Sequence, residues 1–154
     1  MTTTRQHIIE ISFPSEFGYE VIAREAIATF ARCVGFDRDR IDDLKTAVSE
    51  ACINAIEHGN KKVHGLTIDI VGVYDGNMLQ IDIADQGIQQ YQVAGAPATI
   101  EEKIAGKAPA RGMGLLLMTQ LADEAHFLPD TNGTRGNRFR LIWRERVETL
   151  EPEH

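Results

Sequence analysis

The sequence has 154 residues, which suits a single domain with one hydrophobic core. Its 43% of hydrophobic and 25% of charged residues are typical of a folded globular protein, and it contains no run of about 18 apolar residues that would predict a membrane span. A formal net charge of −7 disfavours direct binding to the phosphates of nucleic acids.

The two ends of the chain and its cysteines indicate an ordinary intracellular domain. Residues 1–7 lack the apolar segment of a secretory signal, so we expect a cytoplasmic protein. Cys33 and Cys52 lie among apolar neighbours and outside any metal-binding spacing, which predicts two buried, reduced thiols. We expect one domain over 1–147, followed by a disordered acidic tail over 148–154.

The first elements follow from hydrophobic periodicity. Residues 7–13 form an apolar run that predicts a strand. Apolar residues recur at helical spacing over 18–34 and again over 40–58, which predicts two helices. Asp37 or Asp39 can cap the second helix, because a short side-chain oxygen accepts hydrogen bonds from the free backbone amides of its first turn.

The middle of the chain is typical of a β-hairpin followed by a long connection. Residues 66–73 and 78–85 predict two strands, and Gly76 allows a tight turn between them. Residues 87–111 are rich in Ala, Gly, Gln and Pro. Because long segments of this kind are uncommon inside compact domains, we interpret this one as a lid or a mobile loop.

The last elements are a helix over 115–122 and strands over 125–128 and 138–143, the strands being joined around Asn132-Gly133. Strands outnumber helices and occur in adjacent pairs. This order favours an α+β fold: a two-layer sandwich in which a mixed, mostly antiparallel sheet carries its helices on one face.

Polar residues on the second helix form the first candidate site. Glu50, Asn54 and Glu57 are spaced by four and three residues, so on a regular helix they lie within a sector of roughly 60°. A carboxylate can accept the proton of an attacking hydroxyl group, and an amide oxygen suits Mg²⁺. A solvated helix face is the structural alternative for such a polar stripe.

Three glycine-containing segments follow in the chain. Asp85-Gln86-Gly87 ends a strand, where a carboxylate can accept a hydrogen bond from an amine of a nucleotide base and a glycine allows close approach. The segment 111–114 opens an apolar helix, whose N-terminus favours anions. Gly133-Thr134 precedes the last strand. Each segment alone is also explained as a turn, but together they supply the parts of a nucleotide site.

These motifs resemble those of a known family. Residues 43–59 resemble the N box of the GHKL ATPase superfamily, and more narrowly that of bacterial anti-sigma-factor serine-protein kinases of the RsbW type. Residues 84–87 resemble the first glycine box of these kinases, residues 111–118 the second, and Gly133-Thr134 their closing element. The resemblance extends from about Phe13 to Trp143.

The resemblance implies the Bergerat ATP-binding fold, ATP and Mg²⁺ as cofactors, and serine/threonine protein kinase activity. It implies that Glu50 is the general base and that Asn54 coordinates Mg²⁺. It further implies that Asp85 binds the adenine amine, while Gly112 and Gly114 form a hinge of the lid. The implied nucleotide-binding residues are Asn54, Asp85, Gly87, Arg111, Gly112, Met113, Gly114, Leu115 and Thr134.

The resemblance also implies partners. Members of the family phosphorylate a STAS-domain anti-anti-sigma factor, sequester a sigma factor and act as homodimers, so we expect these partners and neither nucleic acid nor membrane.

Gln89 departs from the second glycine of the wider Asp-x-Gly-x-Gly pattern. The alternative is a non-catalytic, nucleotide-responsive binding module, which the presence of both Glu50 and Asn54 disfavours. A histidine kinase would need phosphoacceptor helices, for which the residues before the N box leave no room.

Overall fold

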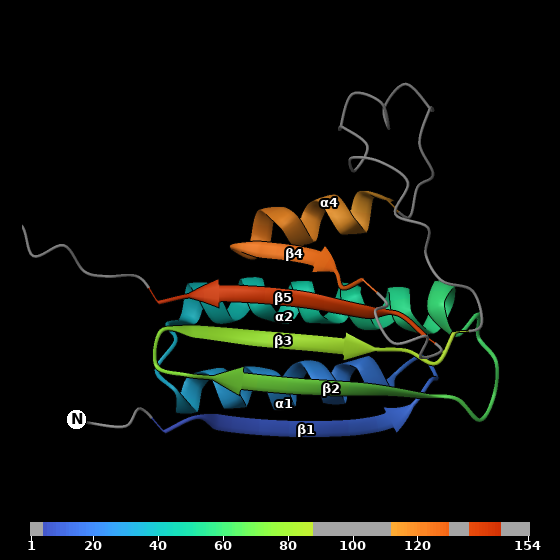
Figure 1. The fold of residues 1–154 in the computed structure, drawn as a ribbon, viewed down its shortest axis with the longest axis horizontal. Coiled ribbons are helices and arrows are strands. Elements are labelled where there is room, and N and C mark those ends of the chain that lie inside the picture. Colours follow the sequence, from blue (N-terminus) through green and yellow to red (C-terminus); the bar gives the residue numbers. More distant parts are fainter. Residues whose placement is uncertain (1–4, 88–111, 130–135, 146–154) are drawn as a thin grey trace, which may run out of the picture.

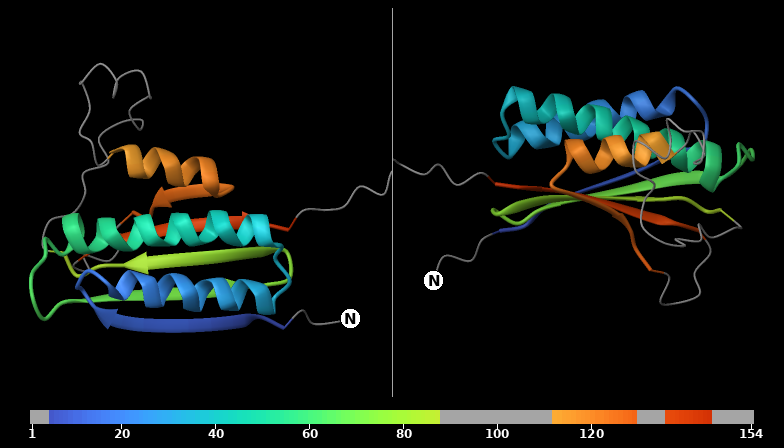
Figure 2. Two further views of the ribbon diagram at one scale, coloured as in Figure 1. Left: turned by 180° about the vertical axis from the view of Figure 1, so that it is seen from behind. Right: turned by 90° about the horizontal axis from the view of Figure 1, so that it is seen from above.

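One sheet with helices on a single face organises the chain in this computed structural model, which describes residues 5–87, 112–129 and 136–145 (Figure 1). The view from above shows the helical layer and the sheet as two separate layers (Figure 2). The predicted α+β sandwich is therefore confirmed. Within the described residues no helix combines the length and the apolar character that crossing a membrane requires.

Every helix and strand that the sequence predicted is present, with bounds shifted by a few residues. In chain order the elements are β1 (His7–Pro14), α1 (Tyr19–Cys33), α2 (Arg38–Asn54), the π-helical turn η1 (Ala55–Gly59), β2 (Thr67–Tyr74), β3 (Met78–Ala84), α4 (Gly112–Leu121), β4 (Glu124–Phe127) and β5 (Arg138–Arg144).

The strands lie in the order β1-β2-β3-β5-β4, and each neighbouring pair is antiparallel. The sequence analysis expected a mixed sheet. Strands β3 and β4 do run in the same direction, but β5 lies between them, so parallel strands are not neighbours among the described strands (Figure 1).

The core lies between the sheet and helices α1 and α2. Leu79, Ile81 and Ile83 alternate along β3 and are at most 2% exposed, as the alternation in the sequence predicted. Ile27 of α1 and Leu44 of α2 are equally buried against this face. Burying a side chain of this size contributes about 1.5–3 kcal/mol, so the core fixes where α2 lies on the sheet. Cys52 is buried as predicted, but Cys33, at the C-terminal end of α1, is exposed, so its predicted burial is wrong.

Helix α2 has a defined start and an unusual end. Asp37 caps it by accepting a hydrogen bond from the backbone N–H of Arg40 at 2.9 Å, so Asp37 rather than Asp39 has the predicted role. At its C-terminus the helix widens into η1, where the N–H of Asn60 donates to the carbonyl oxygen of Ala55 at 2.7 Å. Single π-helical turns of this kind are rare and often mark functional sites.

Candidate nucleotide site

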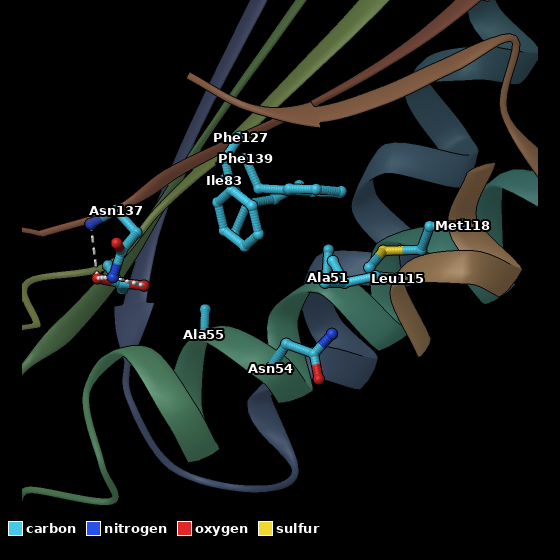
Figure 3. Close-up of a pocket in the computed structure, with 10 residues that line it drawn as sticks. Ala51, Asn54, Ala55, Ile83, Leu115, Met118, Phe127, Asn137 and Phe139 are labelled. Atoms are coloured by element: carbon cyan, nitrogen blue, oxygen red, sulfur yellow. Dashed lines mark hydrogen bonds between the residues drawn. The ribbon is translucent and has the colours of Figure 1, made fainter. Parts of the chain in front are cut away.

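A pocket of about 290 Å³, including its open mouth, lies between α2, α4 and the ends of β3 and β5 (Figure 3). Two aromatic rings, Phe127 and Phe139, form one wall at a centroid distance of 4.9 Å and face Ala51 and Asn54 across the pocket. Apolar walls with few polar groups suit a flat heterocycle. The lining residues are Ala51, Asn54, Ala55, Ile83, Asp85, Leu115, Met118, Phe127, Asn137 and Phe139.

The buried carboxylate of Asp85 is the polar end of this pocket. Its Oδ1 accepts hydrogen bonds from the backbone N–H groups of Gly87 at 3.0 Å and Asn137 at 2.8 Å, and from Asn137 Nδ2 at 3.1 Å. Its Oδ2 has one longer contact, to Asn137 Nδ2 at 3.3 Å. Because Oδ1 is already saturated, Oδ2 is the oxygen with capacity to accept a further donor.

Burial also shifts the pKa of this group. It raises the pKa of Asp85 above its ordinary value of 3.8, and the hydrogen bonds from Asn137 and Gly87 oppose this only in part. A raised pKa in a pocket with specific hydrogen-bond partners is typical of functional carboxylates, although buried structural groups also show it.

Three glycine backbones close around Asp85. A Cβ atom at Gly59 would lie 1.9 Å from Asp85 Oδ2, and one at Gly87 would lie 2.0 Å from the carbonyl oxygen of Gly59. At Gly136, where φ is +109°, a Cβ would lie 2.0 Å from the carbonyl oxygen of Asp85. These distances exclude any side chain, so the end of η1 packs against the Asp85 carboxylate and the residue two positions before β5 packs against the Asp85 backbone.

The N-terminal end of α4 lies beside the polar edge of α2. A Cβ atom at Gly114 would be 3.1 Å from Glu50 Oε2 and 3.4 Å from Asn54 Nδ2. The carboxylate, the carboxamide and the backbone of a helix N-terminus therefore come together. Free amides at such a terminus favour anions, phosphate among them.

Glu57, which the sequence analysis placed on the same edge, lies in the π-helical turn. The regular helical spacing used for that prediction does not hold across η1. The Glu57 carboxylate lies 3.9 Å from Nε2 of His58. Glu57 is accordingly absent from the linings described for the pocket and for the groove beside it.

Glu50 also belongs to a larger and more open groove of about 760 Å³ on the helical face. Lys45 Nζ of α2 lies 3.2 Å from Glu25 Oε1 of α1, so this ion pair links the two helices beside the groove. Arg24 Nε, on the same helix as Glu25, also lies 3.2 Å from that oxygen. The groove is lined by Arg24, Asp42, Lys45, Thr46, Ser49 and Glu50. Glu50 thus lies both in this groove and beside Gly114, at the start of α4.

The structure brings together most of the predicted site residues. Asn54, Asp85 and Leu115 line the pocket, and Gly87 and Gly114 lie against its polar groups. Gly112 and Met113 form the first turn of α4. The predicted residues Arg111 and Thr134, the departure at Gln89, and residues 88–111 of the predicted lid lie outside the described residues.

Sequence analysis missed Gly136-Asn137, which contacts Asp85 three residues after the predicted Gly133-Thr134. The sheet register explains the contact: Ala84 pairs with Arg138, so the adjoining residues Asp85 and Asn137 are neighbours. A glycine directly before the last strand was the available signal. It could not be used, because the pairing of β3 with β5 is not readable from local sequence.

A comparison with protein families covers every residue that lines the pocket. The model of the histidine kinase-like ATPase domain matches residues 13–143. Serine-protein kinase RsbW of Bacillus cereus is 33% identical over 144 residues, which cover 91% of this chain and 88% of that protein. The RsbW proteins of Bacillus anthracis and Bacillus thuringiensis match with the same identity and coverage.

Proposed function

This chain belongs to the family of RsbW serine-protein kinases, built on a histidine kinase-like ATPase domain, and we propose that it transfers phosphate from ATP to a serine of a partner protein. The observation that carries the proposal is that one site has suitable groups for a base at one end and for phosphates at the other. Asp85 supplies a buried acceptor at one end, and Glu50 and Asn54 meet the N-terminus of α4 at the other.

At the pocket end, the adenine ring would lie between the phenylalanine wall and Ala51 of α2. The 6-amino group of adenine is a donor and would bind Asp85 Oδ2, which retains acceptor capacity. A guanine base presents a carbonyl oxygen at the same position. Two acceptors facing each other repel, so this arrangement selects ATP over GTP.

At the other end, Asn54 would hold a Mg²⁺ ion, which when bound neutralises charge on the phosphates of ATP. The donor set fits this ion, because Mg²⁺ prefers hard oxygen ligands, keeps several waters and needs few protein groups. The amide groups at the start of α4 would bind phosphate oxygens directly.

We expect Asn54→Ala to weaken ATP binding by about tenfold or more when Mg²⁺ is present, because one ligand of the ion is lost. In EDTA the variant and the wild-type protein should differ much less. Calorimetric titration with ATP in both buffers checks this, with Asn77→Ala in the exposed β2–β3 turn as the control. Equal affinities of both proteins in Mg²⁺ would remove the metal role from Asn54.

The groove beside Glu50 suggests how the acceptor serine arrives. A serine on an extended segment in this groove would bring its hydroxyl group to the Glu50 carboxylate, which orients the hydroxyl and accepts its proton. We propose that the partner is a STAS-domain anti-anti-sigma factor, that a sigma factor is the second client, and that the protein acts as a homodimer in the cytoplasm. Family membership supports these three assignments.

A larger side chain in the groove should weaken binding of the protein substrate without changing nucleotide binding. We expect Thr46→Arg to raise the KM for the protein substrate by at least about tenfold, because a long side chain occupies space that the acceptor segment needs. ATP affinity should stay unchanged, and Thr46→Ser should behave as the wild type. Steady-state phosphorylation at varied partner concentration measures the effect. An unchanged KM in Thr46→Arg would place the acceptor elsewhere.

A further inference from the structure

A network of hydrogen bonds around the buried side chain of Asn60 joins the end of η1 to the turn that carries Asp85. Asn60 directly follows η1 and is 1% exposed. Its Oδ1 accepts the backbone N–H of Gln86 at 2.7 Å, and its Nδ2 donates to the carbonyl oxygen of Thr67 at 3.1 Å. Asn60 does not line the pocket, so it has no direct route to a bound base.

Gln86 completes the network from the other side. Its Oε1 accepts the backbone N–H of Thr67 at 2.7 Å and the Thr67 hydroxyl at 3.2 Å. Asn60, Thr67 and Gln86 therefore form a closed set of contacts, here called the Asn60 clasp. The clasp connects three segments that are separate in the sequence: the end of η1, the start of β2 and the turn after β3.

The clasp lies beside the most closely packed contacts around Asp85. Gly59 precedes Asn60, and neither Gly59 nor Gly87 has room for a Cβ atom: one at Gly87 would meet the backbone of Gly59, and one at Gly59 would meet the side chain of Asp85. Asp85 Oδ2 lies directly against Gly59. Any change in the spacing between η1 and the Asp85 turn therefore moves the oxygen that faces the base.

The backbone next to Asn60 is strained. Lys61 and Lys62 have φ values of 51° and 59°, a left-handed conformation that is uncommon for residues with side chains. Such conformations persist only when surrounding contacts determine them, and they concentrate at functional sites. Here the N–H of Lys62 donates to the carbonyl oxygen of Ile56 at 2.9 Å, and the N–H of Val63 donates to that of Asn60 at 3.0 Å.

We propose that Asn60 is a positioning residue for recognition of the base. Through the clasp it fixes Asp85 relative to the helix that carries Glu50 and Asn54. The groups that bind the base and those that bind the phosphates therefore keep a fixed position relative to each other. The inference rests on the proposed nucleotide site and adds a determinant of its specificity. A carboxylate held in place accepts the amine of adenine and repels the carbonyl of guanine, whereas a carboxylate that can shift discriminates less.

The experiment measures the dissociation constants of MgATP and MgGTP by calorimetry and the kcat for phosphoryl transfer at saturating ATP. Asn60→Ala leaves the Gln86 N–H without its buried acceptor. We expect about tenfold weaker ATP binding, a GTP-to-ATP ratio of dissociation constants reduced by about the same factor, and kcat within about twofold of the wild type.

Matched variants separate positioning from general destabilisation. Gln86→Glu keeps an acceptor oxygen for Thr67 and should retain the wild-type ratio, whereas Gln86→Leu removes that acceptor and should lower the ratio. Leu79→Val, at the far end of β3, should lower the melting temperature without changing the ratio.

A lowered ratio in Asn60→Ala and Gln86→Leu, with a wild-type ratio in the two other variants, supports the proposal. A wild-type ratio in Asn60→Ala, with a fall in melting temperature like that of Leu79→Val, overturns it and leaves Asn60 a purely structural residue. If Asn60→Ala does not fold, Gln86→Leu decides, since its side chain is exposed. A wild-type protein that binds neither nucleotide overturns the proposed site itself and this inference with it.

Discussion

Replacing Glu50 by glutamine should lower the rate of phosphoryl transfer to the partner serine by about a hundred- to ten-thousand-fold, the usual effect of removing a general base. The glutamine side chain has the same size and still fits beside Gly114, but it cannot accept the proton of the attacking hydroxyl. ATP affinity and the melting temperature should therefore change little, because Asn54, Asp85 and the start of α4 are untouched.

Glu57→Gln is the matched control for this experiment. It removes a carboxylate seven residues further along, in η1, where Glu57 lies near His58 rather than near Gly114. We expect it to transfer phosphate at the wild-type rate. Single-turnover transfer from labelled ATP measures both variants. Wild-type transfer by Glu50→Gln would mean that another group accepts the proton or that none is needed.

Asp85→Asn should produce the largest loss of nucleotide affinity, about a hundredfold for ATP. Three N–H groups bind Oδ1, so the carboxamide should keep its oxygen there and place its nitrogen at the position of Oδ2. That nitrogen is a donor and faces the donor amine of adenine, which replaces a charge-assisted hydrogen bond by a repulsive contact. Calorimetry with ATP measures this loss, with Asp69→Asn on the exposed face of β2 as the control.

The same variant should gain stability in a pH-dependent way. Because burial raises the pKa of Asp85 in the folded state, the folded protein favours the protonated acid. The wild-type protein therefore loses stability as the pH rises from the ordinary pKa of 3.8 through the raised pKa. The neutral asparagine has no such loss. The melting temperature of Asp85→Asn relative to the wild type should rise over this pH range, and a constant difference from pH 3 to pH 8 would contradict this explanation.

Local sequence was sufficient to predict the elements of the fold. Alternation along residues 78–85 predicted the buried face of β3, and helical spacing predicted α1 and α2 because an apolar stripe must face the core. The polar edge with Glu50 and Asn54 followed from the same spacing, and Gly114 does lie against it.

The remaining features depend on tertiary contacts. The π-helical turn η1 cannot be read from the composition of 55–59; it ends at Gly59, which packs against Asp85, a residue distant in the sequence. That turn also interrupts the regular helical spacing on which the predicted alignment of Glu57 depends. The role of Asn137 depends on the pairing of β3 with β5, two strands far apart in the sequence. The Asn60 clasp likewise joins three segments whose proximity only the sheet creates.

The most direct test of the proposed function is phosphoamino-acid analysis of a STAS-domain anti-anti-sigma protein after incubation with the wild-type protein, labelled ATP and Mg²⁺. We predict label on serine of that protein, lost when ATP is replaced by GTP at the same concentration and lost with Glu50→Gln. Tight binding of the partner without transfer of label by the wild-type protein would contradict the kinase assignment and identify the chain as a non-catalytic binding module.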